Sequence, residues 1–99
     1  MSRIVELTEQ ERLYMPESTH GGILAARALD DDALLALARS DVFKVARGDG
    51  EPKACAAYVQ VIAKTGPRTN PTWVTVRAVE EAYNRGLIDE RELDWLSAR

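Results

Sequence analysis

Helix start and stop signals recur along this 99-residue chain and constrain its fold more than any other pattern. Residues 8–11 read Thr-Glu-Gln-Glu, a capping box in which the threonine and the second glutamate satisfy backbone N–H groups reciprocally. Residues 30–32 are three aspartates, which suit a helix start because carboxylates oppose the positive end of the helix dipole. Gly48, Gly66 and Gly86 each follow a helix-forming run. The chain is therefore expected to be helical throughout.

The signals predict an all-α fold, a compact irregular or orthogonal bundle of five to seven helices with a C-terminal helical hairpin. We expect one helical domain over residues 1–99, since this length suits a single core. Residues 16–22 and 67–72 are expected to be irregular, because both contain proline and small polar residues. The expected helices cover residues 8–15, 23–29, 30–39, 42–47, 51–65, 76–85 and 89–98.

The clearest helix is predicted over residues 51–65. Pro52 suits its first turn, where a missing N–H removes no hydrogen bond. Its apolar residues then fall at helical spacing on one face: Ala54, Ala57, Tyr58, Val61 and Ile62.

Residues 72–76 support two interpretations. Trp73 to Val76 have the composition of a short strand. However, Val76, Val79, Ala82 and Tyr83 continue at helical spacing, which favours a helix capped by Thr72 or Thr75. The short strand remains the alternative.

The C-terminal hairpin is predicted from three local features. Gly86 is expected to end one helix in the left-handed conformation. Residues 89–92 form a second capping box, which starts the next helix. Trp95 and Leu96 are then expected to dock on the core.

No catalytic or metal-binding signature is apparent. His20 and Cys55 are the only histidine and cysteine, and the pattern favours a loop histidine and a small buried thiol. The adjacent aspartates at 30–32 lack the alternating spacing of a calcium loop. We therefore expect a protein that is not an enzyme and binds no metal or cofactor.

Composition indicates a cytoplasmic protein. A single cysteine forms no intrachain disulfide. Residues 1–6 lack the apolar run of a signal peptide, and no apolar run approaches the roughly 20 residues of a membrane span.

The middle of the chain is mildly basic. Residues 39–68 carry six basic and three acidic side chains, whereas both flanking segments are acidic. This segment could contact phosphate groups, through Arg39, Lys44, Arg47, Lys53, Lys64 and Arg68. A helix-turn-helix at residues 82–88 is disfavoured, because residues 89–95 carry four carboxylates against one arginine.

Two short segments resemble known local motifs. Residues 46–54, which lead into Tyr58, resemble the helix–Gly-Asp–helix turn of some phage small-terminase proteins. Residues 86–93 are similar to helical hairpins appended to many bacterial proteins. Each covers about a tenth of the chain. The resemblance implies a bacterial or phage origin and carries over no functional residue.

The leading functional hypothesis is a small binding protein, acting through a helical surface on a protein partner or on a second copy. Trp73, Tyr83 and Trp95 lie in the last third of the chain, and such residues are enriched at interface hot spots. A nucleic-acid-binding accessory protein of small-terminase or helix-turn-helix type, using residues 39–68, is the alternative.

Overall fold

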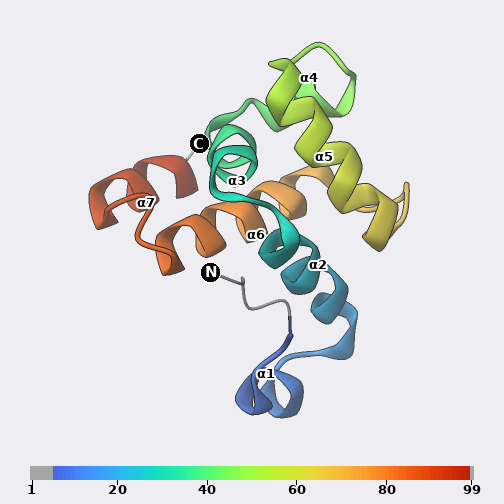
Figure 1. The fold of residues 1–99 in the computed structure, drawn as a ribbon, viewed down its shortest axis with the longest axis vertical. Coiled ribbons are helices and arrows are strands. Elements are labelled where there is room, and N and C mark those ends of the chain that lie inside the picture. The colour runs from blue at the N-terminus through green and yellow to red at the C-terminus, as the bar shows by residue number, and fades with distance from the viewer. Residues whose placement is uncertain (1–5, 99) are drawn as a thin grey trace.

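The computed structural model describes residues 6–98, apart from the side chains of residues 17–19, and the described chain is helical without a strand (Figure 1). The all-α prediction is therefore confirmed. The seven helices of the described range are α1 (Glu9–Tyr14), α2 (Glu17–Ala28), α3 (Asp31–Arg39), α4 (Val42–Ala46), α5 (Pro52–Thr65), α6 (Pro71–Asn84) and α7 (Glu90–Ser97).

Side-chain caps define where most of these helices begin. In α1 the Thr8 hydroxyl accepts from the Glu11 amide at 3.1 Å, and the Glu11 carboxylate accepts from the Thr8 amide at 2.8 Å. The predicted capping box at residues 8–11 is therefore formed. Other helices begin at a side chain that accepts a backbone N–H, namely Asp30 for α3, Asp41 for α4, Asn70 for α6 and Asp89 for α7.

The core is organised around α3. Leu34 and Leu37 of this helix are completely buried, and α3 packs mainly on α5 and α6. One hydrophobic cluster draws side chains from α2 through α7. The apolar face predicted for residues 51–65 belongs to it, since Ala54, Ala57 and Val61 are buried.

Arg85 ties the end of α6 to the end of α2. Its guanidinium donates to the carbonyl oxygens of Leu29 at 2.8 Å, Arg27 at 3.0 Å and Ala26 at 3.3 Å. The same side chain also donates to Glu81 at 2.8 Å. A helix leaves its last carbonyls without intrahelical partners. Arg85 donates to the carbonyls of Leu29 and Arg27, and it shares the Ala26 carbonyl with the Leu29 amide.

The prediction of a loop at residues 16–22 is wrong, because α2 begins directly after Pro16. The glycines that suggested a loop lie inside the helix. A Cβ built on Gly22 would overlap the six-membered ring of Trp73. Gly22 is therefore required by close packing of α6 on α2, not by a turn.

Residues 72–76 are helical, and α6 begins earlier than predicted. Asn70 is the cap, with its side-chain oxygen 2.9 Å from the Thr72 amide, so neither Thr72 nor Thr75 starts the helix. The predicted apolar face is only partly correct. Val79 and Ala82 are buried, whereas Val76 and Tyr83 are exposed.

The C-terminal hairpin forms with two differences in detail. Gly86 has a φ of 75°, as predicted, and the next amide reaches back to the Ala82 carbonyl in a Schellman motif. The second capping box is only half formed, because the Glu92 carboxylate binds Arg39 instead of turning back to Asp89. Leu96 docks on the core as expected, but the Trp95 side chain is 67% exposed.

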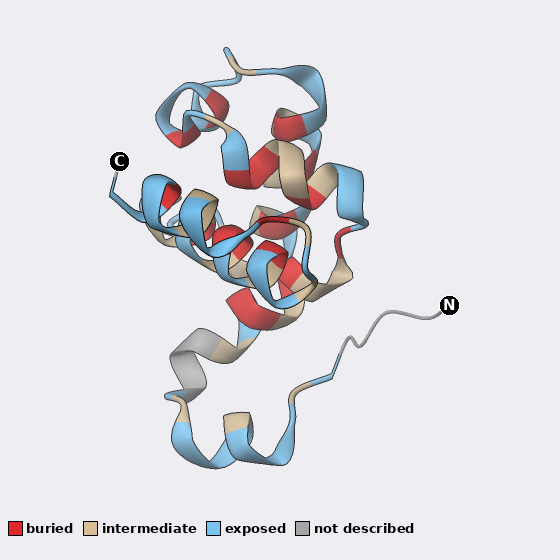
Figure 2. Ribbon diagram, turned by 90° about the vertical axis from the view of Figure 1, so that its left-hand side faces the viewer, coloured by how far each residue is buried: buried red, intermediate tan, exposed pale blue. Residues whose placement is uncertain are grey.

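Helix α1 lies apart from the core (Figure 2). None of its residues is buried. Arg27 of α2 holds it, donating to Glu11 Oε1 at 2.7 Å and to Glu11 Oε2 at 2.5 Å, and to the Glu6 carbonyl at 2.8 Å. Polar contacts rather than apolar burial therefore attach this helix.

Candidate protein-interaction groove

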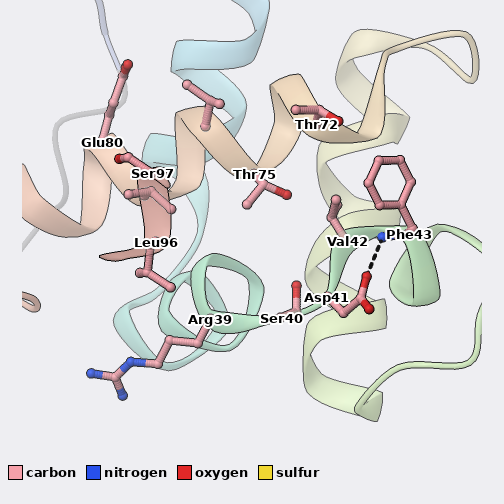
Figure 3. Close-up of a pocket in the computed structure, with 12 residues that line it drawn as sticks. Arg39, Ser40, Asp41, Val42, Phe43, Thr72, Thr75, Glu80, Leu96 and Ser97 are labelled. Atoms are coloured by element: carbon pink, nitrogen blue, oxygen red, sulfur yellow. Dashed lines mark hydrogen bonds between the residues drawn. The ribbon is translucent and has the colours of Figure 1, made fainter. Parts of the chain in front are cut away.

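An apolar groove of about 630 Å³ lies between the α3–α4 corner, α6 and the end of α7 (Figure 3). We call it the α6 groove. It is lined by Arg39, Ser40, Asp41, Val42, Phe43, Thr72, Thr75, Val76, Val79, Glu80, Leu96 and Ser97. Grooves of this size are typical of binding sites in proteins.

A tight helix-to-helix corner forms one side of the groove. The Ser40 hydroxyl donates to the Leu37 carbonyl at 2.6 Å, which closes the last turn of α3. One residue later, Asp41 accepts from the Phe43 amide at 3.1 Å and starts α4. This short connection places Val42 inward, whereas the Phe43 side chain stands at the mouth and remains 57% exposed.

The floor comes from α6 and α7. Val79 and Leu96 are buried at its base, and Val76 is 45% exposed within it. The α6 residues that line the groove run from Thr72 to Glu80, which corresponds to about 12 Å of helix. Val76 on α6 and Phe43 on α4 thus leave apolar surface open to solvent beside this stretch of roughly two helical turns.

Both signs of charge border the groove. Arg39 pairs with Glu92 through two hydrogen bonds of 2.7 and 3.0 Å, and this pairing raises the pKa of the guanidinium. Glu80 accepts from Arg77 at 3.0 Å. Asp41 adds a carboxylate that is already engaged by α4 amides. The border can therefore face a surface that also carries both signs.

Of the three aromatic residues predicted at an interface, Trp73 and Tyr83 lie far apart on the same helix. Trp73 is partly buried against Gly22 of α2, with the Arg77 guanidinium 5.2 Å from its ring centroid. Tyr83 lies ten residues later on α6, about 15 Å along the helix axis. Trp95 is exposed on α7. None of the three lines the α6 groove, so their interface role stays a prediction.

The six basic residues divide into paired and unpaired sets. Arg39 pairs with Glu92, Arg47 lies 3.7 Å from Asp49, and Lys53 lies 3.9 Å from Asp32. Within the part of the chain that the structure describes, the others form no ion pair, namely Lys44, Lys64 and Arg68. Contact between these six residues and nucleic acid stays a prediction.

The residues that could carry chemistry serve local structure. His20 Nε2 lies 3.0 Å from the Met15 carbonyl at the end of α1. His20 lies within α2 and not in the expected loop. Cys55 is partly buried, with its sulfur 4.0 Å from the Val45 carbonyl. Among the described residues no group of three potential ligands could hold a metal ion.

Sequence reasoning missed Phe43 and Val76 as groove residues. Phe43 is the only phenylalanine of the chain and directly follows a capping aspartate and a valine. In a helix of five residues, two adjacent large apolar side chains cannot both face the core. That local conflict was the available signal for an exposed aromatic residue.

No helix within residues 6–98 has the length and apolar content to span a bilayer.

Comparison with known proteins gives no relative. No protein-family model matches the chain, and neither curated proteins nor solved structures give a significant match.

Proposed function

We propose that this chain is a small protein-interaction module and that the α6 groove binds a second copy of the chain. The observation that carries the proposal is an apolar groove with an exposed phenylalanine at its mouth. The proposal assigns the sequence hypothesis of a binding protein acting on itself to this groove.

Self-association is favoured because one patch supplies both a projection and a cavity. A two-fold interface places the same patch on both copies, so each copy must provide what the other receives. Phe43 is the projection, and the floor formed by Val42, Val79 and Leu96 is the cavity. Burying one such side chain stabilises an interface by about 1.5–3 kcal/mol, and the symmetry supplies this contact twice.

The charges at the border agree with this arrangement. Arg39 carries one sign, and Asp41 and Glu80 carry the other. Because the Arg39 side chain stays half exposed although it pairs with Glu92, a two-fold axis can place it beside a carboxylate of the second copy. Such complementarity fixes the register of an interface more than it adds affinity.

Light scattering coupled to size-exclusion chromatography tests the proposal. The wild-type chain should change from monomer to dimer between about 10 and 500 µM, the range that a dissociation constant of about 100 µM predicts. Val76→Lys places a charge in the groove and should remain monomeric throughout. Phe43→Ala should weaken the dimer as well.

Val59→Lys is the matched control. Val59 is 66% exposed in the middle of α5 and does not line the groove, so this variant should dimerise like the wild type. Circular dichroism checks that all variants keep their helix content. A wild-type chain that stays monomeric at 500 µM, or equal loss of dimer in both lysine variants, overturns the proposal.

The remaining sequence hypotheses join the proposal as predictions. They are a cytoplasmic location, a bacterial or phage origin, and the absence of enzymatic activity. The proposed site needs no catalytic group, because apolar burial alone accounts for its binding.

A further inference from the structure

A second cavity, of about 410 Å³, lies at the other end of α5 from α4. It is bordered by the glycines of α2, the last turn of α5, the 66–70 connection and the start of α6. We call it the Lys64 pocket, after the basic side chain that lines it. It shares no lining residue with the α6 groove.

Among the described side chains that line this pocket, the only charge is the positive charge of Lys64. The sequence contains no aspartate or glutamate from Pro52 through Val79, a stretch that includes Lys64 and Arg68. No described side chain that lines the pocket is acidic. Lys64 and Arg68 also lie outside every ion pair of the described residues, unlike Arg39, which already binds Glu92. A cationic side chain left without a carboxylate favours an anionic ligand.

The wall of the pocket is ordered before any ligand binds. The Thr69 hydroxyl lies 2.9 Å from the Thr65 hydroxyl and 2.8 Å from the Gly66 carbonyl, which fixes the 66–70 connection. The Asn70 side chain already caps α6. An anion in this pocket would therefore be bound by Lys64 rather than by the helix end.

Trp73 gives the pocket an aromatic side. Gly22 meets the edge of its six-membered ring, and Arg77 covers one ring face. Trp73 nevertheless lines the pocket and is only partly buried. At Gly21, which also lines the pocket, a built Cβ would meet no atom within 4 Å, so the pocket is open there.

We infer that the Lys64 pocket binds a phosphate ester, with its phosphate beside Lys64 and its organic part against Trp73. The cavity falls in the size range of small-ligand sites. Lysine is a common phosphate ligand, and aromatic side chains bind nucleobases by stacking. Free nucleotides and single-stranded nucleic acid both present this chemistry.

Tryptophan fluorescence provides the test. Trp95→Phe leaves Trp73 as the sole tryptophan, so its emission reports on the pocket. This variant is titrated with inorganic phosphate, AMP and a ten-residue oligothymidylate at low salt. AMP should change the Trp73 emission more than phosphate does. In the same background, Lys64→Gln should weaken binding about tenfold, since it removes a charge-assisted hydrogen bond.

Two matched controls locate the effect. Lys44→Gln removes another exposed charge, on α4 and away from the pocket, and should leave the affinity unchanged. Gly21→Glu introduces a carboxylate at the open border and should weaken binding, whereas Gly21→Gln should weaken it less.

The ligand series identifies the source of the phosphate. Saturation by AMP assigns the pocket to a nucleotide, and binding of the oligothymidylate alone assigns it to a nucleic-acid strand; either outcome supports the inference if Lys64→Gln weakens it. If none of the three ligands changes Trp73 emission, or if Lys64→Gln and Lys44→Gln bind alike, the inference is wrong.

Discussion

Gly21 and Gly22 are adjacent in α2 yet have opposite surroundings. A Cβ on Gly21 would enter open space, whereas one on Gly22 would overlap the Trp73 ring. Neither residue has a positive φ. The first glycine therefore lowers helix stability without a packing reason, and the second makes room for α6.

This difference predicts effects of opposite sign for the same substitution. Gly21→Ala should raise the free energy of unfolding by about 0.5–1 kcal/mol, because alanine loses less backbone entropy in a helix. Gly22→Ala should lower it by about 1–3 kcal/mol, the usual cost of overpacking a tight contact. Urea denaturation followed by circular dichroism measures both. Equal effects of the two substitutions would contradict the packing role assigned to Gly22.

Among the helices, sequence predicted those whose boundaries are set locally. Asp30 and Asp89 cap the helices that they were expected to start, and Asp41 caps α4 directly before the helix expected over residues 42–47. The start of α6 was wrong because the local signal of the Asn70 cap and Pro71 was missed. The start of α2 was wrong because a distant contact accounts for its glycines. The glycines of α2 suggested a loop because the packing partner of Gly22, Trp73, lies 51 residues later in the chain.

Helix α1 is the element whose attachment should depend on pH. Hydrogen bonding to Arg27 lowers the pKa of Glu11 from 4.5 to about 2. The Glu11 carboxylate also accepts a hydrogen bond from the Thr8 amide, and Glu81 is a second carboxylate 3.6 Å from the same arginine. A depressed pKa means that the stabilisation is complete above pH 4.5 and is lost as the pH falls towards 2.

We therefore expect α1 to detach in acid while α2–α7 stay folded. In NMR spectra, the helical chemical shifts of Leu13 and Tyr14 should disappear between about pH 4.5 and pH 2. Glu11→Gln should detach α1 already at neutral pH, because the ion pair with Arg27 is gone. Glu9→Gln, at an exposed position of the same helix, should behave like the wild type. Simultaneous loss of α1 and the core shifts would contradict separate attachment.

At the scale of the whole molecule, the class of the fold was predictable and the groove was not. Caps and periodicity each act within a few residues. The α6 groove, in contrast, combines side chains from three separate segments, within residues 39–43, 72–80 and 96–97. Its existence depends on how α3, α4, α6 and α7 pack against one another, which no local pattern specifies. The same limit applies to the aromatic residues. Trp73, which was predicted at an interface, packs against α2, whereas Phe43, which was not, lines the groove.

The distribution of buried residues predicts which part of the chain unfolds as one unit. The hydrophobic cluster includes residues from α2 through α7 and none from α1. A variant that lacks residues 1–15 should therefore keep one cooperative urea transition, with its free energy of unfolding lowered by about 1 kcal/mol through lost polar contacts. Leu37→Ala, at the centre of α3, should lower it by about 2–5 kcal/mol. If the truncation costs as much as Leu37→Ala, α1 contributes to the core despite its exposure, because polar contacts at the surface cannot equal a central cavity.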